Sequence, residues 1–484
     1  MYLGIDLGTS ALKALLIDAD QRVVASATGA LAVDRPHPGW SEQDPARWIA
    51  AAEAALDRLK EGHGAALGAV RGIGLAGQMH GASLLDRADK VLRPAILWND
   101  TRAHEEAARL DALPEFRAIT GNIVFPGFTA PKLVWVRRHE PELFARTAKV
   151  LLPKDHLRLW LTGEHVSDMS DAAGTGWLDT GARDWSARLL ELGGMDSGQM
   201  PRLVEGTAVS GTLRPDLAAR WGLGPGVAVA GGGGDNAASA VGIGAIGSGA
   251  AFISLGTSGV LFAATAAYRP NPESAVHTFC HAVPRAWHQM GVILAAGDAL
   301  AWFSRLTGAA PEALAAELGE RLRPPGAISF LPYLAGERTP HNDARIRGAF
   351  AGLDHGADRP ALTHAVLAGV AFALGDCLEV LRGAGTGISS AIAVGGGSRS
   401  RYWLKLIATV LGVRVEVPAA GDFGAAFGAA RLGLVAAEGA DPEAVCRPPP
   451  IAETIAPESA LVSAYHDAWH RYRALYPALK GALP

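Results

Sequence analysis

The order of hydrophobic and polar residues at the start of the chain predicts a β-meander. Residues 2–5 alternate as a short strand, residues 6–10 (DLGTS) form a turn, and further strands follow at 11–17 and 22–28. A strand therefore comes after the glycine turn, whereas the phosphate loops of P-loop and dinucleotide-binding proteins are followed by a helix. A phosphate held here would be bound by turn amides and hydroxyl groups instead. The alternative interpretation is an ordinary hairpin, and the turn taken alone favours neither.

The tetrapeptide of this turn occurs twice in the chain. Leu-Gly-Thr-Ser stands at 7–10 and again at 255–258, and an offset of 248 places YLGIDLGTSALKALL over AAFISLGTSGVLFAA. This internal repeat predicts a duplicated domain in which each copy offers one phosphate turn. The copies differ at one position, since Asp6 of the first copy corresponds to Ser254 of the second. Only the first copy would then supply an acid for a metal ion.

Four consecutive glycines, Gly231 to Gly234, follow an alternating run of small and β-branched residues and lead to Asp235 and Asn236. Glycine lets the backbone turn sharply and lets another molecule approach closely. An acid placed just after such a turn lies where a strand ends, a common place for chemistry in α/β proteins. We interpret this segment as the centre of a phosphoryl-transfer site, with Asp235 as the base and the two LGTS turns holding phosphates.

Helical periodicity marks several longer elements. Asp44 and Pro45 open a helix as N-cap and first residue, and Gly62 is expected to end it. Further helices are predicted at 129–139, 362–380, 424–438 and 457–479. The aromatic stripe of the last helix is interpreted as core packing.

Polar residues follow two apolar strands in the first half of the chain. The strand at 72–75 leads to Gln78-Met79-His80-Gly81, and a second apolar stretch leads to Trp98-Asn99-Asp100. A single His or Trp at such a place is more often structural than functional. Two polar strand ends together favour a polyol pocket, because sugar hydroxyls need several paired donors and acceptors.

A third glycine-rich turn lies at 391–401 (AIAVGGGSRSR), between a strand and a helix that is expected from about residue 402. The N-terminus of a helix after a glycine turn is a good place for the ribose and phosphates of a nucleotide. Two other segments, 72–77 and 242–247, match the GxGxxG pattern of dinucleotide-binding proteins. Neither clearly opens a helix, so we set the dinucleotide interpretation aside.

One stretch has the length of a membrane span. Residues 236–268 contain no charged side chain. Glycines and polar residues interrupt the stretch, and we predict two short strand-like pieces there instead of a spanning helix. No membrane association is expected.

Composition narrows the class of protein. The chain has 484 residues, 49% hydrophobic and 19% charged, with a net charge of −4 and a pI of about 6.4. No long basic run is present, which argues against a nucleic-acid partner. The three cysteines, Cys280, Cys377 and Cys446, are far apart and suggest neither disulfides nor a zinc site. Together with a start that lacks the pattern of a signal peptide, they favour the cytoplasm.

Nine segments spread over the whole chain carry a family resemblance. They are GIDLGTS at the start, GWSEQDP (39–45), GQMHG (77–81), AILWNDTR (95–102), GFTAPKLVW (127–135), AGGGGDNAA, SLGTSG, PYLAGERTPH and GGGSRS. With these segments the chain resembles the FGGY family of carbohydrate kinases. The QMHG, ILWND, LLPKD and SDAAGT segments resemble those of the bacterial members that act on xylulose.

The resemblance implies an α/β fold of two duplicated actin-like ATPase (ribonuclease H-like) domains with a catalytic cleft between them. Residues 1–245 would form the N-terminal domain, with the sugar site, the base and the first phosphate turn. Residues 246–484 would form the C-terminal domain, with the second phosphate turn and the nucleotide site, and the last helix could pack back on the first domain.

The implied activity is the ATP-dependent phosphorylation of D-xylulose at its C5 hydroxyl. The product, D-xylulose 5-phosphate, would feed xylose catabolism into the pentose phosphate pathway. The resemblance implies ATP and Mg²⁺ as cofactors, a cytoplasmic location and a homodimer.

The resemblance also assigns site residues by position. Asp235 matches the acid that takes the proton from the sugar hydroxyl, and Asp6 matches the acid near the metal. The sugar-binding positions are Met79, His80, Trp98, Asn99, Asp100 and Asn236. The phosphate and nucleotide positions are Thr9, Ser10, Lys13, Gly256, Thr257, Ser258, Gly396, Gly397 and Ser398.

Two features depart from the family pattern. Ala361 and Ala368 stand where the second family signature usually has acids, which we interpret as a change at the surface or between the domains. The glycine run before Asp235 is also one residue longer than expected. The first departure bears on local packing or regulation and not on the expected chemistry.

Three rival functions remain open on the sequence. The first is another FGGY kinase acting on ribulose, glycerol, gluconate or a polyol, although the QMH and WND wording favours xylulose. The second is an actin-like, nucleotide-binding filament or scaffold protein, against which Asp235 and the polar strand ends argue. The third is a sugar-responsive regulator, for which no appended DNA-binding segment is seen.

Overall fold

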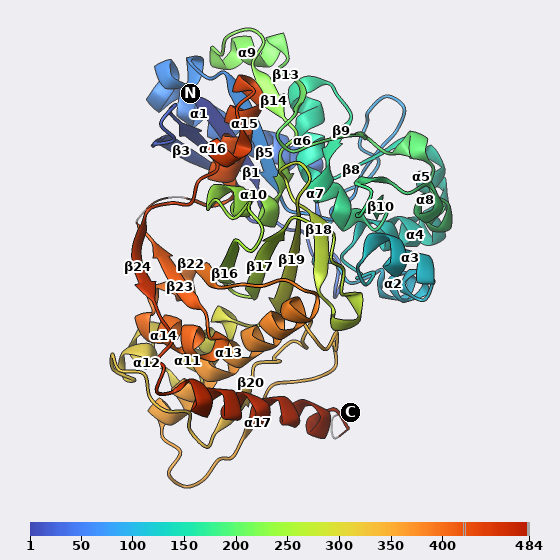
Figure 1. Ribbon diagram of the computed structural model, residues 1–484. Coiled ribbons are helices and arrows are strands. Elements are labelled where there is room, and N and C mark those ends of the chain that lie inside the picture. The colour runs from blue at the N-terminus through green and yellow to red at the C-terminus, as the bar shows by residue number, and fades with distance from the viewer. Residues whose placement is uncertain (420, 422, 482–484) are drawn as a thin grey trace.

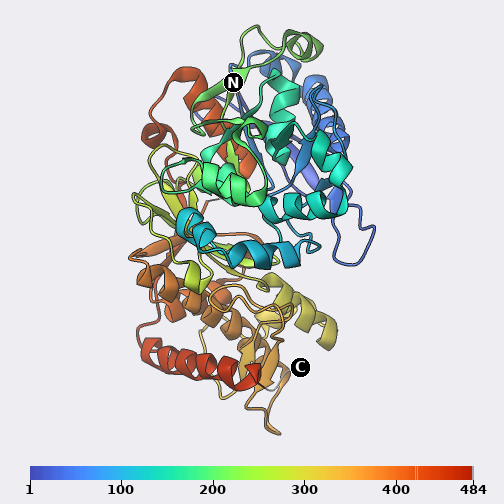
Figure 2. The ribbon, with the colours of Figure 1, turned by 90° about the vertical axis from the view of Figure 1, so that its right-hand side faces the viewer.

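The structure, a computed structural model, describes residues 1–419, 421 and 423–481. These residues form two lobes, one above the other in the views of Figures 1 and 2. Each lobe is built around a seven-stranded sheet. The chain starts in the first lobe, and its last helix lies at the far end of the second (Figure 1).

The first sheet has the strand order β13-β14-β5-β1-β2-β3, and β15 pairs with β5. Its strands are β1 (Tyr2–Leu7), β2 (Ala11–Ile17), β3 (Val23–Ala30), β5 (Gly72–Gly77), β13 (Val209–Thr212), β14 (Ala228–Ala230) and β15 (Gly233–Gly234). The second sheet has the order β18-β19-β17-β16-β22-β23-β24. Its strands are β16 (Ala251–Leu255), β17 (Gly259–Thr265), β18 (His277–Cys280), β19 (Trp287–Ile293), β22 (Ser390–Val394), β23 (Arg414–Pro418) and β24 (Ile451–Ile455).

The remaining elements cover the sheets or form small additions to them. The helices are α1 (Pro45–Gly68), α2 (His104–Asp111), α3 (Pro114–Thr120), α4 (Thr129–His139), α5 (Pro141–Arg146), α6 (Pro153–Thr162), α7 (Met169–Ala172), α8 (Ala187–Gly193), α9 (Pro215–Trp221), α10 (Asp235–Gly242), α11 (Gly297–Thr307), α12 (Pro311–Ala316), α13 (Arg359–Gly383), α14 (Arg401–Leu411), α15 (Ala425–Glu438), α16 (Pro442–Val445) and α17 (Val462–Lys480). Short 3₁₀ turns are η1 (Ala173–Thr175), η2 (Ser197–Gln199), η3 (Pro272–Ser274) and η4 (Gly396–Arg399). Two-stranded ladders are formed by β4 (Glu42–Gln43), β6 (Ser83–Leu85), β7 (Ala95–Ile96), β8 (Lys149–Leu151), β9 (Val166–Asp168), β10 (Leu178–Asp179), β11 (Asp184–Trp185), β12 (Arg202–Val204), β20 (Ser329–Leu331) and β21 (Ala349–Ala351).

The two sheets repeat one topology, which confirms the predicted duplication. In the first, β1 runs antiparallel to β2 and parallel to β5; in the second, β16 runs antiparallel to β17 and parallel to β22. The hairpin turns differ by one residue, because Leu7 pairs with Leu12 whereas Leu255 pairs with Gly259. A strand follows each LGTS turn, as the pattern predicts.

The predicted helices are present. The start of α1 agrees with the prediction, and its end does not. Asp44 caps α1 by accepting a hydrogen bond from the amide of Ala46 (3.0 Å). The predicted end at Gly62 is wrong: the helix is kinked at His63, which has φ −142°, and continues to Gly68. The two short strands predicted within residues 236–268 are confirmed as β16 and β17, whereas the alanine-rich start of that stretch forms α10, a helix that was not predicted.

Two helices make contacts that join the two lobes, and we call them the crossing helices. Although α15 follows the second sheet in sequence, it packs across β1, β2, β5 and β14 of the first sheet. Gly4 and Gly74 allow this contact, since a Cβ on either would lie within 1.8 Å of a carbonyl oxygen of α15. The GIGLAG segment is therefore a strand that packs closely against a helix. It is α15, and not the last helix as expected, that returns to the first lobe; α17 packs on α13, α14 and β20.

The other crossing helix is α10. A Cβ on Gly428 of α15 would lie 1.8 Å from the carbonyl oxygen of Ala238, so the two crossing helices touch backbone to backbone. On another side of α10, Ala240 and Ile243 join a hydrophobic cluster with Phe252 of the second sheet. The helix is therefore held by both lobes (Figure 1).

Helix α13 has the length and hydropathy of a membrane span, but 89% of its most apolar window is buried inside the protein. It is the only helix of that kind among the described residues. Ala368 lies within it, only 6% exposed and part of the core of the second lobe. The interpretation of Ala368 as a surface or inter-domain position is therefore wrong. The three cysteines are buried and free.

Candidate functional site

Three strand ends of the first sheet meet at one edge. Leu7 of β1 is paired in parallel with Gly77 of β5, and Gly77 is paired with Gly234 of β15. Side chains that belong to or follow these strand ends therefore gather in one place, the usual position of a binding site in an open α/β sheet. Asp6, the 78–80 segment and Asp235 all come from this edge.

Asp235 is the first residue of α10 and is partly exposed. Its Oδ1 atom accepts hydrogen bonds from the backbone amide (2.7 Å) and the side-chain Nδ2 (3.0 Å) of Asn236. Burial raises the pKa of Asp235 to about 6, although the bonds from Asn236 act in the opposite direction. Within the described residues, neither an ion pair nor a hydrogen bond engages Oδ2. A carboxylate oriented through one oxygen and open at the other suits a general base.

Met79 packs against the residue that precedes Asp235, and His80 follows Met79 in the chain. A Cβ on Gly234, the residue before Asp235, would lie 2.9 Å from the sulfur of Met79. His80 has the left-handed φ of 69°, a strained conformation for a residue with a side chain. Its carbonyl oxygen accepts bonds from Lys132 Nζ (2.8 Å) and Thr129 Oγ1 (3.1 Å), which hold the strained turn in place.

The imidazole of His80 is fixed in orientation and in charge. Its ring stacks on Phe128, with centroids 4.8 Å apart, and its Nδ1 lies 2.6 Å from the carbonyl oxygen of Gly174. That carbonyl requires a proton on Nδ1, so Nε2 is the acceptor of the neutral ring. Burial lowers the pKa of His80 to about 3, and the ring is therefore neutral at physiological pH.

The first phosphate turn is connected to the polar strand ends. Thr9 Oγ1 donates to Gln78 Oε1 (3.1 Å) and accepts from the indole nitrogen of Trp98 (3.0 Å). Gln43 Nε2 donates to the carbonyl oxygen of Thr9 (2.7 Å). Trp98 remains 45% exposed, so its ring offers an aromatic face at the edge of the site. Gln43 and Gln78 were not predicted as site residues, although both lie in segments that carry the family resemblance.

The other predicted sugar-binding residues differ in whether their polar atoms already have hydrogen-bond partners within the protein. Asn99 Oδ1 is buried without a hydrogen-bond partner among the described residues, and thus lacks a donor. Asp100 is 1% exposed, and its two oxygens are occupied by Arg102 (2.9 and 2.7 Å) and by the amide of Ser41 (2.6 Å). Asp100 therefore holds its loop in place, and a direct contact with sugar stays a prediction. Asn236, for its part, orients Asp235.

Asp6 and Lys13 are paired directly across the first hairpin. Both side chains make further interactions within the protein. No group of three or more His, Cys, Asp or Glu side chains suitable for a metal occurs in the described part of the chain. A single aspartate is nevertheless compatible with Mg²⁺, which is commonly bound through one or two carboxylates, waters and substrate phosphates.

The second LGTS turn is anchored through its carbonyl groups. The oxygen of Gly256 accepts from the amide of Gly297 (2.8 Å), and the oxygen of Thr257 accepts from Ala296 (2.9 Å) and Asp298 (3.1 Å). Thr257 is exposed, and Gly256 and Ser258 are partly exposed. The first turn is fixed in the same manner, since Leu31 donates to the carbonyl oxygen of Ser10 (2.9 Å).

A cavity of about 790 Å³ lies between α10 and the glycine turn of the second sheet. Ser239 and Ile243 line one side, and Phe252 contributes from β16. Gly395 and Ser398 also line the cavity, while Gly396 and Gly397 belong to the adjoining turn η4. The remaining lining residues are Ala393, Val394, Arg399, Arg401, Val417, Pro418, Ala419, Gly421, Phe423 and Gly424. The volume and the mixed apolar and polar lining fit a nucleotide.

Comparison with known proteins agrees with this arrangement. Residues 1–242 match the model of the N-terminal domain, and residues 251–437 that of the C-terminal domain, of the FGGY family of carbohydrate kinases. The chain belongs to this family. The fold is accordingly the α/β, two-lobed, actin-like ATPase fold of the FGGY kinases, as the resemblance implies.

Similar proteins within the FGGY family carry a more specific name. The chain is 48% identical to a xylulose kinase of Escherichia coli (strain K12), and the match covers 99% of both chains. It is 48% identical to a xylulose kinase of Klebsiella pneumoniae, again over 99% of each chain. A solved structure described as a xyloylose kinase from Brucella ovis is 66% identical, with a TM-score of 0.98 and 99% coverage of both chains.

Several residues of the site escaped the sequence interpretation. Phe128 and Lys132 lie within the GFTAPKLVW segment, which was used for the resemblance but not assigned a role. From the second lobe, the guanidinium of Arg338 lies 4.9 Å from the ring of Phe125 and 3.4 Å from Nε2 of His277. These contacts bring the lobes together beside His80. The residues involved are far apart in the chain, and no sequence pattern predicted that they would meet.

Proposed function

We propose that the protein transfers the γ-phosphoryl group of ATP to the C5 hydroxyl of D-xylulose and forms D-xylulose 5-phosphate. The observation that carries the proposal is that α10 holds the predicted base at its start and borders the predicted nucleotide cavity. Asp235 stands at its first position, and Ser239 and Ile243 of the same segment line the nucleotide-sized cavity. One helical turn of about 6 Å separates the base from the start of the cavity wall.

In this proposal Asp235 orients the sugar hydroxyl and accepts its proton. In phosphoryl transfer the protein mainly positions the reactants and offsets developing charge. Although a carboxylate is a weak base, it suffices because the hydroxyl proton leaves late, once the bond to phosphorus has begun to form. The pKa of about 6 keeps Asp235 mostly ionised at neutral pH while making it more basic than an ordinary aspartate.

The ketose would be held by the polar strand ends. His80 offers Nε2 as an acceptor, and Asn99 offers a buried oxygen to which none of the described residues donates. A sugar hydroxyl can satisfy either acceptor. The exposed ring of Trp98 offers an apolar face for the carbon skeleton. The 48% identical relatives named xylulose kinase support xylulose as the acceptor.

The triphosphate would lie between the two LGTS turns. Mg²⁺ would be held through Asp6 and would offset charge on the β- and γ-phosphates when bound. Thr9, Ser10, Lys13, Gly256, Thr257 and Ser258 are the proposed phosphate contacts. Closure of the lobes would exclude water, which otherwise competes with the sugar as acceptor.

A coupled assay for ADP release against a panel of pentuloses, hexonates and polyols tests the proposal. D-xylulose should give the highest kcat/KM, and analysis of the product should place the phosphate on C5. A clearly higher kcat/KM for another acceptor would overturn the substrate assignment. A gluconate kinase from Lactobacillus acidophilus, 25% identical with a TM-score of 0.92, makes gluconate a necessary member of the panel.

Two accompanying proposals concern the state of the protein rather than its chemistry. A homodimer and a cytoplasmic location are proposed on the family resemblance. Light scattering of the purified protein tests the first, and cell fractionation tests the second. The scaffold alternative has its own test: ATP-dependent pelleting without sugar phosphorylation would support it.

A further inference from the structure

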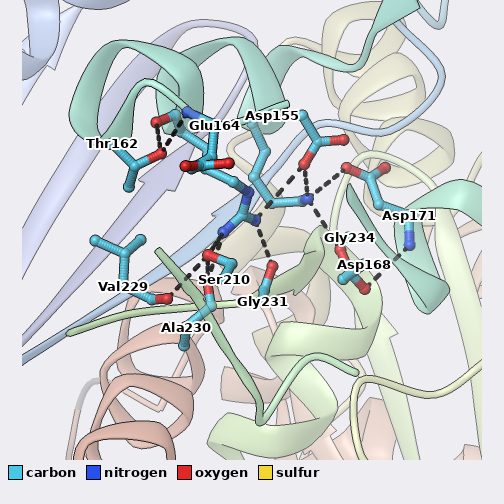
Figure 3. Close-up of polar contacts among 12 residues, drawn as sticks. Asp155, Thr162, Glu164, Asp168, Asp171, Ser210, Val229, Ala230, Gly231 and Gly234 are labelled. Atoms are coloured by element: carbon cyan, nitrogen blue, oxygen red, sulfur yellow. Dashed lines mark hydrogen bonds and ion pairs between the residues drawn. The ribbon is translucent and has the colours of Figure 1, made fainter. Parts of the chain in front are cut away.

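Five ionisable side chains are buried together beside the glycine run that leads to Asp235, and Figure 3 labels three of them, Asp155, Asp168 and Asp171. Lys154, Asp155 and Arg158 come from α6, Asp168 from the end of β9, and Asp171 from α7. Each of these side chains has an exposure of 0%. We call these five residues the buried charge cluster. None of them was assigned a role in the chemistry.

The cluster is held together by Lys154. Its Nζ contacts Asp155 Oδ1 and lies 2.9 Å from Asp168 Oδ1 and 3.3 Å from Asp171 Oδ2. Arg158 Nη2 lies 3.6 Å from Asp155 Oδ1. Burial raises the pKa of Asp171 well above its usual value, and Asp155 and Asp168 act in the same direction, whereas Lys154 opposes the shift. Two basic groups and three carboxyl groups are thus packed together without exposure to solvent.

A buried cluster of ionisable side chains is a costly way to stabilise a protein. Removing charges from water costs free energy that their mutual attraction repays only partly, and apolar side chains of similar size often serve as well. We therefore expect the cluster to have a function besides stability. The hydrogen bonds that leave the cluster indicate one, because they go to the backbone just before Asp235.

The first set of bonds comes from Arg158. Its Nη1 donates to the carbonyl oxygen of Ala230 (2.6 Å) and to Ser210 Oγ (2.5 Å), and its Nη2 donates to the carbonyl oxygen of Gly231. Ser210 Oγ lies in turn 2.9 Å from the carbonyl oxygen of Val229. The guanidinium thus fixes the end of β14 and the start of the glycine run.

The second set reaches the other end of the glycine run. The backbone amide of Gly234 donates to Ser170 Oγ (3.1 Å), and Ser170 Oγ donates to Asp168 Oδ2 (2.5 Å). The other oxygen of Asp168 pairs with Lys154. Gly234 is the N-cap of α10 and directly precedes Asp235. A continuous path therefore runs from Lys154 through Asp168 and Ser170 to the backbone next to the base.

We propose that the buried charge cluster positions the catalytic base: through Arg158 at one end and Ser170 at the other, it fixes the glycine run and thereby sets where Asp235 stands. The inference rests on the proposed function, in which Asp235 accepts the sugar proton. Four glycines in a row have no side chains that could anchor them, and glycine is the most permissive backbone. Since a displacement of about 1 Å can cost roughly 10²-fold in rate, an external anchor has a clear use.

Ser170→Ala tests the inference with the smallest change. It removes the acceptor of the Gly234 amide but leaves all five charges in place. We expect kcat to fall about 10- to 100-fold, while the KM for ATP stays within about twofold of wild type. Because burial is the main cause of the raised pKa of Asp235 and the cluster does not contribute to it, the acidic limb of the pH–rate profile should not move.

The chain supplies a matched control. Ser167 lies on the same short strand as Asp168 and is equally buried, but its hydroxyl has no hydrogen-bond partner among the described residues. Ser167→Ala removes a hydroxyl of the same size and should leave kcat within about twofold of wild type. Ser170→Cys keeps the size of serine with a weaker hydrogen-bonding group, and should give a loss between those of Ser170→Ala and wild type. It also serves if the alanine variant does not fold.

The outcomes separate the inference from the proposed function. All assays use the acceptor that the wild-type enzyme turns over best. A kcat for folded Ser170→Ala within twofold of wild type, or an equal loss in Ser167→Ala, overturns the positioning role and leaves the proposed function intact. A shift of the acidic limb in Ser170→Ala would also overturn it, in favour of an electrostatic effect. If wild-type protein phosphorylates no acceptor in the panel, both proposals fail.

Discussion

Met79 packs directly on the backbone of Gly234: a Cβ at that glycine would lie 2.8 Å from Cγ and 2.9 Å from the sulfur of Met79. The two residues come from strand ends 155 positions apart in the sequence, as 234 minus 79 gives. Their contact places the predicted sugar-binding segment against the residue that precedes Asp235. In the proposed function, the same packing would set the position of the sugar and the position of the base.

Removal of the base is the first test of the site. Asp235→Ala should lower kcat by about 10² to 10⁴, the usual range for a general base, while sugar binding measured by calorimetry changes little. Asp216→Asn, an exposed surface change, provides the control and should retain full activity. Activity of Asp235→Ala within about threefold of wild type would remove Asp235 from this role.

The pH dependence follows from the pKa of Asp235. Burial raises that pKa to about 6, and the base works only when ionised. We therefore expect kcat/KM for the sugar to be constant between about pH 7 and 8, and to fall about tenfold per pH unit below about pH 6. His80 should add no second limb in this range, because its pKa is about 3. A profile flat down to pH 5 would contradict the assignment of the base.

The raised pKa also predicts a cost in stability. Since the folded state favours the protonated carboxyl, stability is highest below the pKa of the unfolded chain and is lost as pH rises through about 6. Asp235→Asn should therefore raise the thermal midpoint at pH 8. The gain should shrink as the pH is lowered towards 4. An equal gain at both pH values would show that ionisation of Asp235 is not the cause.

Changes at the sugar-binding segment should divide the two substrates. His80→Ala should raise the KM for the sugar about 10-fold or more, as expected for loss of one buried hydrogen-bonding partner, and spare the KM for ATP. Met79→Ala should act in the same direction. Steady-state kinetics with each substrate varied in turn provides the measurement. An equal effect on both KM values would argue against a sugar contact.

The glycine turn at the cavity beside α10, where we propose that the nucleotide binds, offers the converse experiment. A Cβ on Gly396 would meet only Arg399 Nη2, at 3.8 Å, so Gly396→Val should fold normally. If the nucleotide approaches this turn, the added side chain raises the KM for ATP and leaves that for the sugar unchanged. Gly387→Ala, which also points into open space, is the control. An unchanged KM for ATP in Gly396→Val would place the nucleotide elsewhere.

Sequence patterns were informative wherever local chemistry decides the structure. Alternation predicted both hairpins, the N-cap at Asp44 located the start of α1, and periodicity gave α4 its observed bounds. Sequence patterns were less informative where tertiary packing determines whether a helix forms and where it ends. The alanine-rich segment of α10 lacked a clear period because it is buried on more than one side, and the kink at His63 hid the continuation of α1.

The sequence by itself determined the repeated hairpins, the polar strand ends and the family to which they belong. These depend on residue types at fixed local spacings, which the chain carries wherever it folds. Only the tertiary structure decided that α15 crosses to the first sheet, that the amide of Ser41 donates to Asp100, and that Lys154 and Ser170 stand behind the glycine run. Such relationships join segments far apart in the chain through close packing and hydrogen bonds, and no local pattern encodes which distant partner a side chain will meet.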